Sequence, residues 1–402
     1  MDELKCNVSF IVHCCYDGIN HLIDKERLRM KAKVTGLEGV VAADTEIGHV
    51  NGREGELVYR GYWAKDLAVR HSFEEVAYLL WHGKLPGSRE LDDFQSRLAQ
   101  ERRLTPELRR LLEAMPADAP VMTVLMSAAA AMNREEGGPP TVEQAVRLTA
   151  LLPVAIAYRY RRANGLSWPG DSDAAGESSA DREGHVAHYL RLLSGSPASE
   201  AHIRAMNAYM ILAMEHGLNA STFAGRVVVS TGSDMFSAVA ASIGTMKGPL
   251  HGGAPSGVIR LLEEIGTEER AESYMRELLE RGERLMGFGH RVYKTLDPRA
   301  EALREVAAAL SGSDPWLDLA RHAERTAIRL LAEYKPGRRL FTNVEFYAAA
   351  VMRAVQMPPE LFTPTFTAAR VVGWTAHVLE QSRNNRIFRP ESVYVGPMPG
   401  KD

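Results

Sequence analysis

Two histidines set among glycines are the residues of this 402-residue chain best suited to chemistry. His251 lies in Lys-Gly-Pro-Leu-His-Gly-Gly-Ala, residues 247–254, and His290 lies in Gly-Phe-Gly-His-Arg, residues 287–291. Glycine tolerates unusual backbone angles and lets the backbone approach a ligand, so both segments are predicted to be binding loops. Glu345 follows in Asn-Val-Glu-Phe-Tyr, residues 343–347. Two loop histidines and a carboxylate can polarise one carbonyl and remove a proton next to another.

The composition indicates a globular protein without a general affinity for nucleic acids or membranes. Hydrophobic residues make up 45% and charged residues 25% of the chain, and the formal net charge is −3, so any basic site must be local. No apolar run reaches the roughly 18 residues of a membrane span. All three cysteines lie near the N-terminus, which leaves no cysteine-based metal site or disulfide framework in the rest of the chain. Because the acidic start lacks a secretory pattern, the predicted location is cytoplasmic.

Residues 1–35 are predicted to be a poorly ordered or spurious N-terminal extension. Met30 stands just before the first recognisable motif. We therefore favour a translation start at Met30 over the alternative of a natural tail.

Apolar residues with helical spacing, punctuated by glycine and proline, predict an all-α fold. A hydroxyl N-cap with an acid or amide three residues later begins helices at Ser72 and Thr141. Strand-like alternation is confined to residues 40–50 and 56–59, which predict a short N-terminal β-hairpin. Residues 164–183, rich in glycine, serine and aspartate, are predicted to be a surface loop or a disordered insertion.

Taken in order, the motifs resemble the citrate synthase family, in the short bacterial dimeric form that also includes 2-methylcitrate synthases. The resemblance begins near residue 36, passes through His-Gly-Leu-Asn-Ala-Ser-Thr-Phe, residues 216–223, and reaches Phe-Arg-Pro, residues 388–390. It implies an acyltransferase that condenses acetyl-CoA with oxaloacetate and water to give citrate and CoA, by enolisation and carbon–carbon bond formation.

The resemblance also implies a domain organisation. A large helical domain, residues 36–251 and 347–402 with a C-terminal arm, would be interrupted by a small helical domain, residues 252–346. The substrates would lie in the cleft between the two domains. His251 and Glu345 would then stand at the two crossings, where closure assembles the site and excludes water.

Three catalytic roles follow from the resemblance. Glu345 would be the base, His251 would hydrogen-bond the thioester oxygen, and His290 would polarise the ketone of oxaloacetate. Most of the family has aspartate at the position of Glu345, so its carboxylate lies one methylene further out. A misplacement of about 1 Å can cost on the order of a hundredfold in rate. A branch of bacterial citrate synthases shares this Asn-Val-Glu-Phe-Tyr run, which favours compensation by the backbone.

Oxaloacetate is a dianion, and its two carboxylates call for planar, bidentate cations. The family uses arginines and a histidine, and the matching positions here are His216, Asn219, Arg299, Arg370 and Arg389. Arg389 would be donated by the partner subunit, which makes a homodimer a functional requirement.

Coenzyme A would enter as a co-substrate and bind mainly to the second glycine-rich loop. The candidate contacts are Gly287, Phe288, Gly289, Arg291, Lys294, Lys335 and Arg338. Lys335 and Arg338 fit a solvated basic turn equally well. No permanently bound cofactor and no metal are predicted, because no His/Asp/Glu set has metal-ligand spacing.

Two alternatives to a citrate synthase stay open. The first is a 2-methylcitrate synthase with the same site, because one extra methylene changes discrimination by only about 1–3 kcal/mol. The second is a catalytically silent relative that binds acyl-CoA or a dicarboxylate, and Glu345 alone favours it.

Overall fold

The computed structural model describes residues 35–37, 39–133, 138–170, 183–252, 255–289, 293, 295–310, 315–338 and 340–399. The chain divides into two compact units. One is Thr45–Ile387, and the other combines Met1–Asp44 with Phe388–Asp402. All described candidate site residues except Arg389 belong to the first unit. Residues 1–34 of the predicted extension and residues 171–182, which are most of the predicted insertion, lie outside the described residues.

A small antiparallel sheet begins the first unit, with strands β1 (Gly48–Asn51), β2 (Glu56–Tyr59) and β3 (Tyr62–Trp63). Gly48 pairs with Tyr59, and Tyr59 pairs in turn with Tyr62. The predicted hairpin is therefore present, but its first strand begins at Gly48 and not at Val40. Ile47 still accepts a backbone hydrogen bond from Arg60 at 2.9 Å, but β2 ends at Tyr59 and the ladder does not continue towards Val40. The short strand β3 was not predicted.

Helices make up most of the described structure, and the prediction of an all-α fold is confirmed. The capping boxes at Ser72 and Thr141 are both formed, each with reciprocal hydrogen bonds between the cap and the third helical residue. The first helices are α2 (Ala64–Arg70), α3 (Phe73–His82), α4 (Ser88–Glu101), α5 (Pro106–Ala114), α6 (Val121–Ala131), α7 (Val142–Ala163), α8 (His185–Ser194), α9 (Glu200–Met214), α10 (Ala220–Ser230) and α11 (Met235–Met246). The later ones are α12 (Pro255–Ile265), α13 (Glu268–Glu280), α14 (Pro298–Leu310), α15 (Pro315–Tyr334), α16 (Val344–Ala354) and α17 (Phe362–Arg383), with 3₁₀ turns at η1 (Thr35–Leu37) and η4 (Pro359–Leu361).

Helix α17 is the centre of the first unit. It packs against α3, α6, α7, α9, α10 and α11, and its residues are buried on nearly every side. A helix that is apolar all round belongs in the interior of a large core. The polar residues that α17 carries, Arg370 and His377 among them, are therefore brought into that core.

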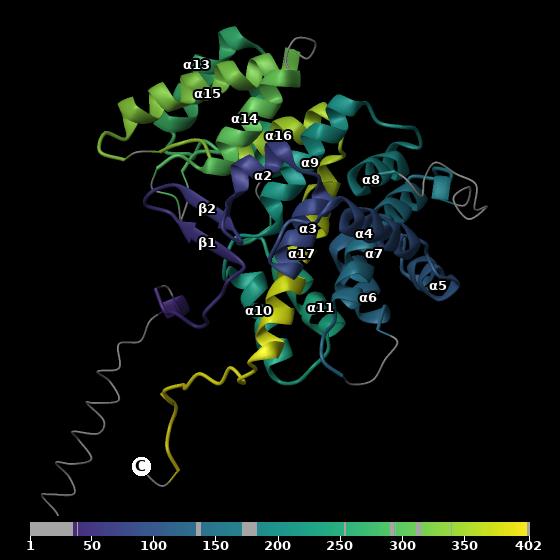
Figure 1. Ribbon diagram of the computed structural model, residues 1–402. Coiled ribbons are helices and arrows are strands. Elements are labelled where there is room, and N and C mark those ends of the chain that lie inside the picture. Colours follow the sequence, from purple (N-terminus) through teal and green to yellow (C-terminus); the bar gives the residue numbers. More distant parts are fainter. Residues whose placement is uncertain are drawn as a thin grey trace, which may run out of the picture. The chain divides into compact units, whose positions relative to one another are not determined.

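A second group of helices carries the other candidate residues. Helix α13 packs against α15, and both α12 and α14 pack against α16. Figure 1 shows α13, α14 and α15 close together in green. Helices α14 and α16 also contact α9, so α9 joins this group to α17. The predicted bounds of a small domain, residues 252–346, stay a prediction.

None of the helices in the described part of the chain is long and apolar enough to cross a membrane. The cytoplasmic location stays a prediction.

Candidate active site

Arg370 is a buried cation at the middle of α17, with only 2% of its surface exposed. Its Nε donates to the carbonyl of Ala213, and its guanidinium lies 4.7 Å from the ring centre of Phe366. The terminal nitrogens make no hydrogen bond with any residue that the structure describes. Burial lowers the pKa of Arg370 and the charge of Glu215 only partly opposes this, and buried guanidinium nitrogens without hydrogen-bond acceptors are costly. This arrangement suits a site that an anion fills.

Arg299 is a second buried arginine, and Asp297 holds it in place at the start of α14. Its Nε donates to Asp297 Oδ1 at 3.0 Å and its Nη2 to Asp297 Oδ2 at 2.9 Å. Asp297 Oδ2 also accepts from the backbone N–H of Val344 at 3.1 Å. Burial acts to lower the pKa of Arg299, but Asp297 raises it above its usual value. One carboxylate thus fixes both Arg299 and the start of α16.

Glu345 lies in the first turn of α16, where Asn343 is the N-cap and accepts from the backbone N–H of Glu345 at 3.0 Å. Its carboxylate makes no hydrogen bond or ion pair with a described residue. Burial raises the pKa of Glu345, and the charge of Arg299 only partly opposes this. A carboxylate with a raised pKa and no partner is a stronger base than an ordinary glutamate.

His251 follows α11 and contacts Ser221 at the start of α10, with 2.8 Å between Nε2 and Oγ. The same Oγ accepts from Trp374 Nε1 at 3.0 Å and donates to Asn219 Oδ1 at 2.8 Å. The hydroxyl has one hydrogen, so it must turn towards His251 before the ring can present its Nδ1–H to a substrate oxygen. Burial and the charge of Arg370 lower the pKa of His251 to about 4, so the ring is neutral at pH 7.

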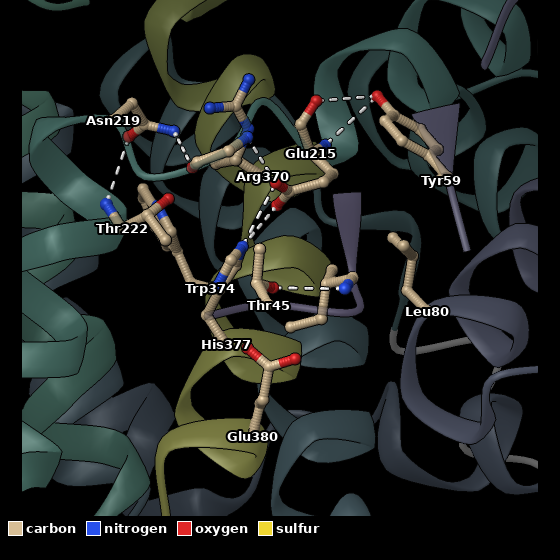
Figure 2. Close-up of polar contacts among 12 residues, drawn as sticks. Thr45, Tyr59, Leu80, Glu215, Asn219, Thr222, Arg370, Trp374, His377 and Glu380 are labelled. Atoms are coloured by element: carbon tan, nitrogen blue, oxygen red, sulfur yellow. Dashed lines mark hydrogen bonds and ion pairs between the residues drawn. The ribbon is translucent and has the colours of Figure 1, made fainter. Parts of the chain in front are cut away.

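His216 lies just after α9, in a turn held from both sides. Its Nε2 is 3.2 Å from the hydroxyl of Tyr293, whose ring meets the imidazole edge to face. The hydroxyl of Tyr59 donates to the carbonyl of Glu215 at 2.8 Å (Figure 2). Asn219 caps α10 by accepting from the N–H of Thr222 at 3.1 Å. Asn219 thus has a structural role as a helix cap in addition to its predicted role in substrate binding. The sequence motif alone does not distinguish the two roles.

These groups share one electrostatic neighbourhood. The charge of Arg370 acts on His251, and the charge of Arg299 acts on both Arg370 and Glu345. The buried phenol of Tyr209 on α9 interacts with both arginines and with Glu345. Three of the predicted residues, on three different helices, are therefore brought together around the end of α9, with His251 beside them.

The glycine-rich loop is joined to the segment that begins α16. Gly289 N–H donates to the carbonyl of Phe341 at 2.7 Å, and Asn343 N–H donates to the carbonyl of Gly287 at 2.9 Å. The side chain of Asn343 donates to the carbonyl of Gly289 at 2.9 Å. The loop that precedes His290 is thus held next to Glu345, although 55 positions separate the two residues in the sequence.

Gly287→Ala is expected to damage this junction. Gly287 has φ +89°, and an added Cβ would lie 2.8 Å from Phe346. Left-handed backbone costs about 1–2 kcal/mol for a residue with a side chain, and the clash adds to it. We expect a lower melting temperature and a loss of activity. The matched control is Gly282→Ala, where φ is +76° and nothing lies within 4 Å, so that it carries the backbone cost alone. Equal effects of the two variants would contradict the prediction.

Some predicted residues are not placed in this cluster. His290, Arg291 and Lys294 lie outside the described residues. Arg389 is exposed and belongs to the unit formed by Met1–Asp44 and Phe388–Asp402. Lys335 and Arg338 are exposed in a turn after α15, in which the N–H of Arg338 donates to the carbonyl of Lys335, as the solvated-turn interpretation expects. Their contact with coenzyme A stays a prediction.

Sequence reasoning missed several residues that support the site. Asp297, Ser221 and Trp374 each lie in the same sequence motif as a predicted site residue. That position could have indicated a supporting role. Glu215 and His377 gave no signal of this kind. Both are fully buried, with His377 Nε2 3.2 Å from each oxygen of Glu215.

No group of three or more His, Cys, Asp or Glu side chains in the described part of the chain could hold a metal ion. The absence of a metal cofactor stays a prediction.

An α-helical fold with a buried cation, an unpaired base and a neutral histidine suits an enzyme that acts on an anionic carbonyl substrate. Comparison with known proteins gives the family. The profile described as citrate synthase, C-terminal domain, matches residues 36–391. The chain belongs to the citrate synthase family, and it is an enzyme that condenses an acyl-CoA with oxaloacetate.

Individual relatives carry two different names. The chain is 38% identical to citrate synthase 2 of Bacillus subtilis, over 90% of this chain and 95% of that protein. It is 39% identical to 2-methylcitrate synthase of Shewanella oneidensis, over 91% of this chain and 96% of that protein. Citrate synthase of Thermoplasma acidophilum, solved with carboxymethyl coenzyme A and oxaloacetate, is 29% identical with a TM-score of 0.79, and the match covers 92% of this chain and 97% of that one.

Proposed function

We propose that this enzyme is a citrate synthase that uses acetyl-CoA as its acyl donor. The observation that carries the proposal is the buried guanidinium of Arg370, whose terminal nitrogens have no hydrogen-bond partner among the described residues, together with the unpaired carboxylate of Glu345; the charge of Arg299 acts on both. A bidentate guanidinium matches a substrate carboxylate, and the neighbouring base matches removal of a proton next to a carbonyl.

Binding of oxaloacetate orients the ketone. One substrate carboxylate takes the two terminal nitrogens of Arg370, and Arg299 and His216 bind the substrate from the sides of α14 and α9. Asp297 prevents Arg299 from rotating away, because it holds two nitrogens of the guanidinium. The complex of the Thermoplasma acidophilum relative with oxaloacetate and a coenzyme A derivative supports the pairing of these two ligands in one site.

Proton transfer then makes the nucleophile. Glu345 takes a proton from the methyl group next to the thioester, and the enolate oxygen accepts from His251 Nδ1–H. A neutral histidine donor suits this step, because it needs no proton from solution at pH 7. The enolate carbon bonds to the ketone carbon, whose oxygen is polarised by His290 and becomes the hydroxyl of citryl-CoA. Water then cleaves the thioester to give citrate and CoA.

The pH profile should report Glu345. The base works only when ionised, so kcat/KM is present above its pKa and is lost as the pH falls through it. Because burial raises that pKa, the midpoint of the acid limb should lie above the ordinary glutamate value of about 4.3. His251 ionises only near pH 4 and affects more acidic conditions. Rates of thiol release between pH 4.5 and 8 test this, and full activity retained at the acidic end of that range would contradict it.

We further propose a homodimer in which Arg389 completes the site of the partner subunit. Neither Arg389→Ala nor Glu345→Gln should then be active alone. Random mixing of the two variants should restore about a quarter of the wild-type activity, because half of the dimers contain one intact site. Activity recovered by mixing under conditions that exchange subunits checks this, and no recovery despite proven exchange would place Arg389 in its own subunit's site.

The acyl donor is decided by steady-state thiol release from acetyl-CoA and propionyl-CoA, each with and without oxaloacetate. A higher kcat/KM for acetyl-CoA supports the proposal. A higher value for propionyl-CoA makes the enzyme a 2-methylcitrate synthase, which the Shewanella oneidensis relative keeps as a specific alternative. Release from neither thioester would favour the catalytically silent alternative.

A further inference from the structure

The carboxylate of Glu215 is a buried charge near the site that the proposed mechanism does not use. It ends α9 directly before His216 and has 0% of its surface exposed. Its Oε1 accepts from the backbone N–H of Gly217, so the side chain closes the turn that contains His216. His377 Nε2 lies 3.2 Å from both carboxylate oxygens (Figure 2).

Arg226 on α10 determines which ring nitrogen of His377 carries the hydrogen. Its Nη1 lies 2.9 Å from His377 Nδ1, and a guanidinium can only donate. His377 Nδ1 must therefore accept, which leaves the single hydrogen of the ring on Nε2 and directs it to Glu215. An imidazolium would set two N–H groups against each other at Nδ1. The contacts thus form an ordered series of donations, from Arg226 to His377 and from His377 to Glu215.

Arg226 is itself held in one orientation. Its Nη1 and Nη2 donate to Glu380 Oε2 at 2.9 and 2.8 Å, and its Nε donates to Gln381 Oε1 at 3.2 Å. Glu380 Oε1 accepts in turn from the backbone N–H of Glu46 at 2.8 Å. The guanidinium therefore cannot turn away from His377 without losing several charge-assisted hydrogen bonds.

The surroundings leave no room for Glu215 to move. A Cβ added at Gly48 would lie 3.0 Å from its Cγ, and one added at Gly373 would lie 2.8 Å from its Oε2. Burial acts to raise the pKa of Glu215, but hydrogen bonds from His377 and Gly217 and the charge of Arg370 lower it below its usual value. The carboxylate is thus ionised, and the N–H of Gly217 bonds more strongly to an ionised carboxylate than to a neutral acid.

We propose that Arg226, His377 and Glu215 are positioning residues for the condensation: the donor series holds the Glu215 carboxylate in place and so fixes the turn that presents His216 to oxaloacetate. The inference rests on the proposed function, in which His216 binds oxaloacetate. None of the three residues touches the reacting atoms, and each acts through the next.

The first test compares two replacements of His377. Glutamine can donate to Glu215 from its amide, whereas phenylalanine fills the space without a donor. A hydrogen bond to a charged group contributes about 1.5–3 kcal/mol, so His377→Phe should raise KM for oxaloacetate by about tenfold or more. His377→Gln should restore most of that loss, and kcat should change less than KM in both variants.

The second test removes the group that sets the tautomer. In Arg226→Met nothing dictates which ring nitrogen of His377 carries the hydrogen, so some rings present a bare Nε2 to Glu215. The KM of the variant for oxaloacetate should therefore exceed that of the wild type, and kcat should change less. The matched control is Arg159→Met, because Arg159 is equally buried but donates to the carbonyls of residues 116, 117 and 119.

The charged and titratable groups around His377 are few. Glu215 faces it from the end of α9 and Arg226 from α10, while Glu380 and Arg370 lie on α17 itself and Tyr59 lies beyond Glu215 on β2. No residue of α3, α6, α7 or α11, all of which are described, makes a hydrogen bond or ion pair with His377. A change of KM in Arg226→Met can therefore be assigned to this series.

Two results would overturn the proposal: an unchanged or lower KM for oxaloacetate in His377→Phe with the fold intact, or a KM for oxaloacetate in Arg226→Met that is no higher than in Arg159→Met. A loss of melting temperature in Arg159→Met without a rise in KM separates positioning from stability alone. The ¹⁵N shifts of the His377 ring, recorded without substrate, show the tautomer directly. A proton on Nδ1 would contradict the donor series even in an active enzyme. A proton on Nε2 in an enzyme that turns over no substrate would contradict the proposed function and leave the donor series intact.

Discussion

Replacing Glu345 by glutamine is expected to lower kcat by about 10²–10⁴-fold, the usual contribution of a general base. Glutamine keeps the shape of the side chain and its place in the first turn of α16, so the substrates still bind. It cannot accept the methyl proton. Thiol release under saturating oxaloacetate and acyl-CoA measures the effect, and KM for oxaloacetate should move only a few-fold.

Two further variants make this result specific. Glu345→Asp keeps the charge but withdraws the carboxylate by one methylene, and a shift of about 1 Å should cost on the order of a hundredfold. Glu305→Gln changes an exposed glutamate on α14 and should leave kcat unaltered. If Glu345→Gln kept a kcat close to that of the wild type, the base would have to be another group.

Replacing Arg370 by methionine is expected to raise KM for oxaloacetate by at least about 30-fold. Truncation of one partner of a buried charge pair costs about 2–5 kcal/mol, and each 1.4 kcal/mol is a factor of ten. Methionine fills the space on Phe366 but offers no donor to a carboxylate. Initial rates as a function of oxaloacetate concentration give the value, and KM for acyl-CoA should change much less.

The control has to exclude a general effect of removing a buried arginine. Arg159→Met removes a buried arginine on α7 that is also 2% exposed. This variant should lower the stability of the protein and leave KM for oxaloacetate unchanged. Arg370→Lys keeps the charge without the planar pair of donors and should recover only part of the affinity. If Arg370→Met bound oxaloacetate as well as the wild type, the buried guanidinium would serve the fold and not the substrate.

Local sequence signals predicted the helical elements because their causes are local. The capping boxes at Ser72 and Thr141 place a hydroxyl and an acid or amide three residues apart, and the structure forms both. The helical spacing within residues 142–158 became the longer helix α7, Val142–Ala163. The strand predicted over residues 40–50 failed before Gly48, because strand pairing depends on a distant partner and β2 ends at Tyr59.

The sequence by itself determined the all-α class, the family and which residue types could do the chemistry. It could not reveal that Asp297 ties Arg299 to the start of α16, because this contact joins segments 47 positions apart. Nor could it assign His377, which looked like an ordinary core histidine. Only the tertiary structure decided that its Nε2 faces Glu215 and its Nδ1 faces Arg226. Protonation and orientation of buried groups depend on neighbours that folding brings together, and no local pattern in the chain encodes them.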